Sequence, residues 1–208
     1  MITNPKMIVI VDIGMGNLGS IQNMFKRVKV EAKASSDPSE IDKASKLVLP
    51  GVGAFDNAMQ SLHELGLIDV LNKKVIKDRT PILGICLGMQ LLGTKSEEGR
   101  MMGLGWIDAQ TVRFQMNSNG LKIPHMGWNT VEVKGDHGIF AGIDEPRFYF
   151  VHSYHLVSNV ASDVLTTTHY GYDFISSVHH ENIWGTQFHP EKSHKFGMKL
   201  FSNFAGLV

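Results

Sequence analysis

The order of apolar and polar positions predicts alternating strands and helices in the first half of the chain. Three short apolar runs, at residues 7–11, 46–49 and 82–85, have the composition of buried parallel strands. A glycine-containing turn accompanies the end of each run, and helical spacing of apolar residues follows. Helices are expected at residues 18–28, from residues 36–39, at 54–77 with an interruption near Gly66, and at 89–92. Repeated strand–turn–helix units imply a parallel sheet with helices on both faces.

The second half of the chain has a different pattern. Short runs of strand-forming residues, separated by turn residues, lie at 131–133, 148–151, 164–168, 175–178 and 183–188. A final helix is expected at about residues 194–204. The 208 residues suit one compact unit. We therefore expect a single α/β domain over residues 1–208, with a mostly parallel central sheet flanked by helices and an added antiparallel β region in the second half.

Composition argues against nucleic-acid and membrane partners and against disulfides and cysteine-rich metal sites. Lysine plus arginine total 20, as do aspartate plus glutamate, so no basic surplus favours nucleic acid. The apolar run at residues 7–11 is too short to span a bilayer, so no membrane partner is expected. The one cysteine, Cys86, excludes an intrachain disulfide and a cysteine-rich zinc site. A lone thiol is compatible with a reducing cytoplasm, where we expect the protein to act.

A turn with a cysteine at its centre follows the third predicted strand. In open α/β sheets, sites form beyond the carboxyl ends of the strands. The sequence at residues 84–88, Gly-Ile-Cys-Leu-Gly, has the form of a nucleophile elbow with Cys86 in the nucleophile position. The glycines avoid collisions in the sharp turn, the following helix stabilises a thiolate, and the Leu87 amide faces a developing oxyanion. The alternative is a small apolar core residue, which the two glycines disfavour.

A histidine and a glutamate lie together after the last predicted strand. Pro190 biases His189 toward extended backbone, in which residues i and i+2 share a side. Glu191 can then orient the His189 imidazole, which is the arrangement of a base and its third group in a catalytic triad. The alternative is a surface turn that opens the last helix. Beside a cysteine elbow, the catalytic interpretation is the stronger one.

Two further groups of residues suggest chemistry less strongly. The turn at residues 50–53, Pro-Gly-Val-Gly, ends the second strand, and its amides can form the second half of an oxyanion hole or only a simple β-to-α turn. The pairs His179-His180 and His152-x-x-His155 have neither a helical His-Glu-x-x-His pattern nor a cysteine partner. We therefore expect no metal site.

These three motifs, in their order and spacing, resemble those of the class I (triad) glutamine amidotransferases. Further segments, at residues 12–18, 124–129 and 149–154, are similar to those of the glutaminase subunits of imidazole glycerol phosphate synthases, from histidine biosynthesis. The resemblance runs from about residue 8 to residue 204. It implies hydrolysis of glutamine to glutamate and ammonia, without a metal or an organic cofactor.

The resemblance assigns a role to each residue of the triad motifs. It implies that Cys86 is the nucleophile, His189 the general acid and base, and Glu191 the partner that orients His189. The amides of Val52 and Leu87 would stabilise the oxyanion. In this family the Val52 peptide reorients before the oxyanion hole is complete, which implies a low resting activity.

The resemblance also implies which residues hold the substrate. Gly53 and Gln90 would contact the glutamine substrate. Ser153 and Tyr154 would contact it through their backbone. These four positions come from the turn after the second strand, the elbow helix and the segment at residues 149–154.

The implied partner is a (β/α)8-barrel cyclase subunit that forms a heterodimer with this chain and receives its ammonia. Asn17 and Trp128 are the expected interface residues, because the turns at 14–17, 50–53 and 126–129 should converge on one face around the nucleophile. Large aromatic side chains dominate interface energetics, which favours Trp128 as an anchor. The alternative is that Trp128 packs inside the β region.

Several alternatives remain at this stage. Ile13 replaces the aromatic residue that the family often has, and residues 103–109 resemble paralogous subunits associated with surface-polysaccharide or surface-sugar modification. A cysteine protease or esterase could use the same elbow, but it would not account for the segment at 126–129. A non-catalytic scaffolding subunit would not need the complete set of Cys86, His189 and Glu191.

Overall fold

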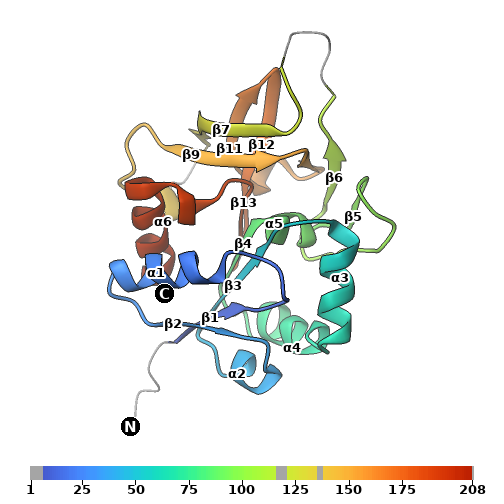
Figure 1. The fold of residues 1–208 in the computed structure, drawn as a ribbon, viewed down its shortest axis with the longest axis vertical. Helices are drawn as coiled ribbons and strands as arrows, with labels where there is room; N and C mark the ends of the chain where they lie inside the picture. Colours follow the sequence, from blue (N-terminus) through green and yellow to red (C-terminus); the bar gives the residue numbers. More distant parts are fainter. Residues whose placement is uncertain (1–6, 116–120, 135–137, 208) are drawn as a thin grey trace.

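The computed structural model describes residues 7–115, 121–134 and 138–207, and a continuous mixed sheet runs through them (Figure 1). Five neighbouring strands form its parallel core: β1 (Ile8–Val11), β2 (Ala32–Ser35), β3 (Lys46–Gly51), β4 (Ile82–Cys86) and β13 (Ile183–Thr186). The other strands of this sheet are β5 (Lys95–Ser96), β6 (Ala109–Arg113), β8 (Glu132–Val133), β10 (Tyr154–Ser158), β11 (Val164–Tyr170) and β12 (Tyr172–His180). Two more strands, β7 (His125–Thr130) and β9 (Arg147–His152), pair with each other in an antiparallel ribbon.

The strand order joins the two halves of the chain through β13. Within the described residues the order is β2-β1-β3-β4-β13-β12-β10-β6-β5, with β11 on β12 and β8 on β11. Strand β13 is parallel to β4 on one side and antiparallel to β12 on the other. The predicted mostly parallel sheet with an added antiparallel region is therefore confirmed.

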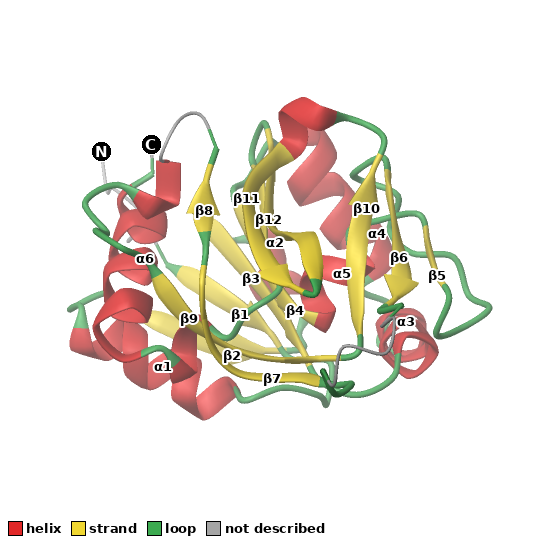
Figure 2. Ribbon diagram, turned by 90° about the horizontal axis from the view of Figure 1, so that it is seen from above, coloured by secondary structure: helices red, strands yellow, loops and turns green. Residues whose placement is uncertain are grey.

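Helices cover both faces of the parallel strands (Figures 1 and 2). Helices α1 (Leu18–Arg27) and α6 (His194–Gly206) lie on one side, and α3 (Phe55–Glu64) and α4 (Ile68–Asn72) lie on the other. The side chains of β1 alternate between the two cores, because Ile8 and Ile10 pack with the first pair while Val9 and Val11 pack with the second. This alternation follows from the two-residue period of a strand. Buried on both faces, such a strand is apolar throughout, as the sequence at residues 7–11 is.

The remaining helical segments are short. They are α2 (Pro38–Asp42), α5 (Leu87–Leu91), a π-helical turn (Lys73–Lys77) and the 3-10 turns Gly138–Phe140, Ala161–Asp163 and Pro190–Lys192. The predicted helix at 54–77 is divided where expected, at Gly66, which has a φ of 65°. None of the helices in the described part of the chain is long and apolar enough to cross a membrane.

Several strands of the second half were not predicted. The sequence of β7, His-Met-Gly-Trp-Asn-Thr, lacks a β-branched run, and β10 follows β9 after a single residue, Ser153. These strands form through pairing with distant partners, since β7 pairs with β9 and β10 pairs with β6. Local sequence carries little information about such pairings, because strand propensity depends on context.

The registers of three neighbouring strands bring the predicted motifs together. Gly51 on β3 pairs with Cys86 on β4, and Gly84 and Ile85 on β4 pair with Gly185 and Thr186 on β13. The three strands are parallel, so the segments that follow them leave the sheet at the same edge. The 50–53 turn, the cysteine elbow and the His189 segment therefore converge at the carboxyl ends of the strands.

Candidate active site

Cys86 lies in a strained turn between β4 and α5. Its backbone has a φ of 56° and a ψ of −109°, which is rare for a residue other than glycine and typical of functional sites. A Cβ atom on Gly88 would lie 1.8 Å from the Leu49 carbonyl oxygen, and one on Gly84 would lie 2.8 Å from the Gly88 carbonyl oxygen. Both flanking glycines are therefore required sterically, as the elbow motif predicts.

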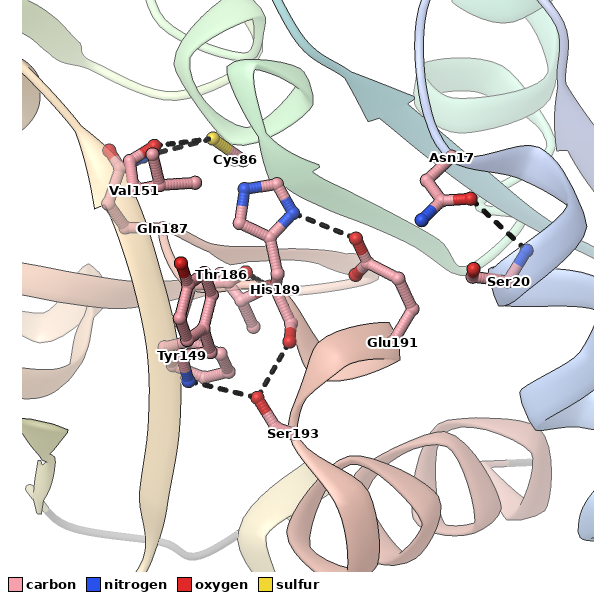
Figure 3. A network of polar contacts seen from close by, with 11 residues as sticks. Asn17, Ser20, Cys86, Tyr149, Val151, Thr186, Gln187, His189, Glu191 and Ser193 are labelled. Carbon is pink, nitrogen blue, oxygen red and sulfur yellow. Dashed lines mark hydrogen bonds and ion pairs between the residues drawn. The ribbon is translucent and has the colours of Figure 1, made fainter. Parts of the chain in front are cut away.

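His189 and Glu191 form a buried pair behind the cysteine. The His189 Nδ1 and Glu191 Oε1 atoms are 2.8 Å apart, and both side chains are 2% exposed. The carboxylate accepts the Nδ1 hydrogen, which leaves Nε2 to face the site. Among the described residues, Nε2 has no hydrogen-bond partner, and Figure 3 shows the ring between Cys86 and Glu191. The structure thus brings the three predicted catalytic residues together.

The electrostatics of the pair favour the imidazolium form of His189. Burial alone would lower the pKa of His189, but the neighbouring Cys86 sulfur and Glu191 carboxylate outweigh it and raise that pKa to about 10. A protonated His189 beside Cys86 can supply the proton that a leaving group requires.

The backbone of His189 is held by Tyr149 and Ser193, to which the sequence analysis assigned no role in the site. The His189 amide donates to the Tyr149 carbonyl at 2.9 Å, and the buried Ser193 hydroxyl donates to the His189 carbonyl at 2.6 Å. The Ser193 oxygen also accepts from the Tyr149 amide at 3.0 Å (Figure 3). These bonds attach the histidine segment to β9. No motif marked Ser193, although its position at the start of the last helix is a place where serine commonly forms such bonds.

Two weak contacts surround the Cys86 sulfur. The Gln187 side-chain amide lies 3.7 Å from Sγ, and Sγ lies 3.9 Å from the Val151 carbonyl oxygen (Figure 3). Cys86 is 7% exposed, so the sulfur is enclosed but open to a small pocket.

That pocket has a volume of about 330 Å³. Each of the predicted oxyanion and substrate residues contributes to its wall: Val52, Gly53, Leu87, Gln90, Ser153 and Tyr154. Cys86 and His189 line it as well, whereas Glu191 lies outside the lining. Gly53 has a φ of 102°, so its turn requires glycine.

The pocket wall also contains residues to which the sequence analysis assigned no role in the site. These are Glu98, Pro124, Val151, His152 and Lys192. Lys192 directly follows the triad glutamate, which was a usable signal. Glu98 lies in a loop without a recognisable motif; its Oε2 accepts the Phe55 amide at 2.9 Å, which attaches that loop to the start of α3. Asp56 strengthens this attachment by accepting the amides of Arg100 and Met101.

The two predicted interface residues lie outside the pocket. Asn17 is exposed and caps α1 by accepting the Ser20 amide at 3.4 Å. Its turn lies beside the 50–53 turn, since a Cβ on Gly16 would be 3.4 Å from the Pro50 side chain. Trp128 is 48% exposed and its ring lies parallel to that of His194, so the alternative that it packs inside the β region is wrong. The convergence of segment 126–129 with the other two turns stays a prediction.

The histidine pairs considered for a metal have other partners. His152 bonds to His125 and to the Tyr154 carbonyl, and His155 bonds to the Tyr172 hydroxyl. In the described part of the chain, no group of three or more histidine, cysteine, aspartate or glutamate side chains could hold a metal ion.

Comparison with known protein families decides the class of this site. The family model of class I glutamine amidotransferases matches residues 9–206. The chain belongs to this family. It is therefore a glutamine amidotransferase, as the motifs predict, and the protease or esterase interpretation is not supported.

Named relatives of this amidotransferase extend the match. Imidazole glycerol phosphate synthase subunit HisH 2 of Methanococcus maripaludis is 56% identical over 95% of this chain and 98% of the relative. The protein of the same name from Pseudomonas aeruginosa is 53% identical over 97% of this chain and 100% of the relative. A crystal structure of a glutamine amidotransferase from Thermotoga maritima has a TM-score of 0.64 and 21% identity, over 95% of this chain and 81% of that one. This last likeness shows the fold.

Proposed function

We propose that this chain is the glutaminase subunit of an imidazole glycerol phosphate synthase and supplies ammonia for histidine biosynthesis. The main support is the arrangement of the three catalytic residues. Cys86 lies in its strained elbow at the wall of a small pocket and faces His189, whose Nδ1 atom is 2.8 Å from the Glu191 carboxylate. Relatives named as parts of that synthase match almost the whole chain, which supports the acceptor half of the proposal.

The first half of the reaction forms a thioester. The Cys86 thiolate attacks the side-chain amide carbon of glutamine, and the carbonyl electron pair moves to oxygen. The amides of Val52 and Leu87 stabilise this oxyanion, each donor contributing ~10²–10³-fold. As the C–N bond breaks, His189 Nε2 gives its proton to the leaving nitrogen, which departs as ammonia.

The second half restores the enzyme. Neutral His189 now takes a proton from water, and the hydroxide attacks the thioester carbon. The C–S bond breaks, and the thiolate and imidazolium are regenerated. The new carboxylic acid loses its proton to solvent, and glutamate leaves. Glu191 stays ionised throughout and holds the ring in the orientation that both steps need. General acid and base catalysis of this kind contributes ~10²–10⁴-fold.

The rest of the pocket wall positions glutamine. Gly53, Gln90 and the backbone of Ser153 and Tyr154 contact the substrate. The Glu98 carboxylate supplies the negative charge that the substrate's ammonium group requires. A residue missed by the sequence analysis therefore completes the substrate set.

The partner follows from the fate of the product. Free ammonia becomes ammonium at neutral pH, which is a poor nucleophile, so the product must pass to an acceptor site through a water-poor passage. We propose a (β/α)8-barrel cyclase as the other half of a heterodimer, docked on the face that carries Asn17 and Trp128. It would join the nitrogen to a phosphoribulosyl aminoimidazole substrate, giving imidazole glycerol phosphate and an aminoimidazole carboxamide ribotide.

A growth experiment tests the proposal directly. Expression of this chain with its own cyclase partner should restore growth without histidine in a host that lacks its glutaminase subunit. The matched control is the Cys86→Ser variant, which should restore growth only when ammonium is abundant. A separate control shows that the cyclase is functional, because it should restore growth in a host that lacks its own cyclase. If the cyclase passes this control and the wild-type pair still fails to restore growth, the histidine assignment is contradicted.

A second candidate function keeps the chemistry and changes the acceptor. Residues 103–109 resemble paralogous amidotransferase subunits associated with surface-sugar or surface-polysaccharide modification, and the Methanococcus and Pseudomonas relatives both carry the number 2 in their names. Under this alternative, deletion of the gene would leave growth without histidine intact and change the nitrogen content of a surface sugar. Growth without histidine, measured in the complementation experiment and after the deletion, therefore separates the two acceptors.

A further inference from the structure

A chain of hydrogen bonds joins strand β7 to the wall of the glutamine pocket. His125 Nδ1 on β7 lies 3.0 Å from His152 Nε2 at the end of β9. His152 Nδ1 in turn lies 2.7 Å from the Tyr154 carbonyl oxygen. At the other end, the Asn129 side-chain nitrogen lies 3.3 Å from His125 Nε2.

The direction of these bonds is fixed by their ends. The Tyr154 carbonyl can only accept, so His152 Nδ1 carries a hydrogen. His152 Nε2 then accepts from His125 Nδ1, and His125 Nε2 accepts from the Asn129 amide. Both imidazoles are neutral in this arrangement. Burial lowers the pKa of His152 to about 3 and that of His125 to about 4, which agrees with neutral rings.

The chain ends at groups that hold the substrate and surround the nucleophile. The Tyr154 carbonyl also accepts from the Gln90 side-chain nitrogen at 3.2 Å. Gln90 donates to Gln187 at 3.1 Å, and the Gln187 amide lies 3.7 Å from the Cys86 sulfur. His152, Tyr154 and Gln90 all line the pocket. A shift of the His152 ring would therefore displace the Tyr154 carbonyl and, through it, the Gln90 side chain.

The other end of the chain lies on a strand with one face outside. Met126 and Trp128 are 61% and 48% exposed, whereas His125 on the same strand is 3% exposed. The His125 ring stacks between Phe150 and Tyr170, with ring centroids 4.8 and 4.1 Å away. Strand β7 thus presents an apolar outer face while its inward histidine is firmly packed.

We propose that His125 and His152 are positioning residues that hold the segment at 152–154 in the geometry that binds glutamine. They act through the Tyr154 carbonyl, without contact between His125 and the substrate. Through them the position of β7, whose outer face carries Trp128, is coupled to the pocket wall. This inference rests on the proposed glutaminase function.

The test replaces His125 with another planar aromatic residue, which can stack in the same position but cannot donate a hydrogen bond. In the complex with the cyclase, His125→Phe should raise the KM for glutamine about tenfold and change kcat by less than ~3-fold, because the lost contact acts on substrate and transition state alike. His125→Asn keeps a donor near the position of Nδ1 and should return KM to within ~3-fold of the wild-type value.

The matched control is His155→Phe. His155 is equally buried and packs on the same Phe114 ring, but it bonds to Tyr172 and to its neighbour Leu156, away from the pocket. His155→Phe should lower the unfolding temperature about as much as His125→Phe does, but it should leave the KM for glutamine within ~2-fold of the wild-type value. An equal rise of KM in both phenylalanine variants, or no rescue by asparagine, would overturn the positioning role.

A second readout keeps this inference separate from the proposed function. Amide hydrogen exchange at residues 152–154 should become faster in His125→Phe and return to the wild-type rate in His125→Asn, whether or not glutamine is turned over. Unchanged exchange in His125→Phe would overturn the inference. Absence of glutamine hydrolysis by the wild-type complex, with the exchange pattern as expected, would contradict only the proposed function.

Discussion

The two walls of the pocket are built by different means. On the parallel side, Cys86 is placed by backbone geometry. Gly88 lets the elbow pack against β3, and Gly84 lets β4 pack against the start of α5, at distances that no side chain tolerates. On the antiparallel side, the 151–154 segment is placed by buried polar side chains, above all His125 and His152. The first wall therefore depends on steric fit, and the second on hydrogen bonds and protonation.

This difference also explains why local sequence patterns predict one wall of the pocket and not the other. A steric requirement for glycine leaves a short, local pattern around the residue that it serves. A hydrogen-bond network between β7, β9 and β10 joins residues that are far apart in the chain, so no local pattern records it. Substitutions in either wall test this difference.

The largest effect is expected at the nucleophile. Cys86→Ser should lower glutamine-dependent activity at least ~10⁴-fold, because a serine hydroxyl is far less acidic than a thiol and the nucleophile acts as a unit with His189. Activity of the assembled enzyme with added ammonium should persist. Steady-state rates with each nitrogen source check this, and normal glutamine turnover by the variant would contradict the assignment.

Changes to the His189 pair come next. His189→Ala should be nearly as severe as the cysteine change, since it removes both proton transfers. Glu191→Gln preserves shape, removes the orienting charge and should lower the rate by up to ~10⁴-fold, which is less than the histidine change. Because the Glu191 carboxylate helps to raise the pKa of His189, the alkaline limb of the rate profile should also move to lower pH in this variant. A loss in Glu191→Gln greater than in His189→Ala would reverse the roles.

Steric fit on the parallel wall is tested by Gly88→Ala. The new methyl would lie 1.8 Å from a backbone oxygen of β3, so the strand and the elbow must separate. We expect a loss of about 4 kcal/mol or more in the free energy of unfolding. Gly19→Ala in α1 is the control, because its methyl meets nothing within 4 Å and should stabilise the helix by ~0.5–1 kcal/mol. Urea titration of both variants measures the difference.

Partner docking is tested at the exposed tryptophan. Trp128→Ala should weaken association with the cyclase by ~1–3 kcal/mol and reduce stimulation of the glutaminase, while the thiol still reacts with a glutamine-like electrophile. Leu65→Ala, at an exposed position of 40% beyond α3, is the control. Titration of the cyclase with each variant measures the affinities. Equal binding by the wild type and Trp128→Ala would remove Trp128 from the interface.

The antiparallel wall should respond to pH in a way that the parallel wall does not. His125 and His152 have folded-state pKa values of about 4 and 3, below the ordinary value of 6.5. The unfolded chain therefore binds more protons as pH falls from 6.5 toward 4, and the free energy of unfolding falls by up to ~1.4 kcal/mol per group and pH unit. The raised pKa of His189 acts in the other direction, with stability lost as pH rises from 6.5 toward 10.

Denaturant titrations at several pH values check this prediction. Between about pH 6.5 and 5.5, His125→Phe should lose ~1 kcal/mol less than the wild type. An identical pH dependence in the two proteins would mean that the histidine is accessible and charges in the folded state.

The sequence predicted the parallel half and its chemistry well. The three buried strands, the elbow at Cys86 and the pairing of His189 with Glu191 all followed from local patterns, and each pattern has a steric or electrostatic cause that the structure displays. The substrate-binding positions came from family resemblance, and the pocket contains each of them.

The missed features depend on long-range packing. Glu98 reaches the pocket only because its loop is attached to α3 through Phe55 and Asp56. His152 was weighed as a metal ligand and as part of the resembling segment 149–154, but not as a support of the pocket wall. Its bond to His125 becomes visible once β7 and β9 are paired. Strand β7 itself has a sequence without strand character. Such residues are fixed by partners that lie 27 to 45 positions away.

Trapping the covalent intermediate tests the role of Cys86 most directly. Wild-type complex mixed with isotopically labelled glutamine, quenched in acid within the first turnover and digested, should yield a labelled glutamyl thioester on the peptide that contains Cys86, as detected by mass spectrometry. His189→Ala should give little adduct, and Cys86→Ser none. Release of labelled glutamate at the full rate with no adduct on Cys86, or adduct on another residue, would contradict the assignment of Cys86 as the nucleophile.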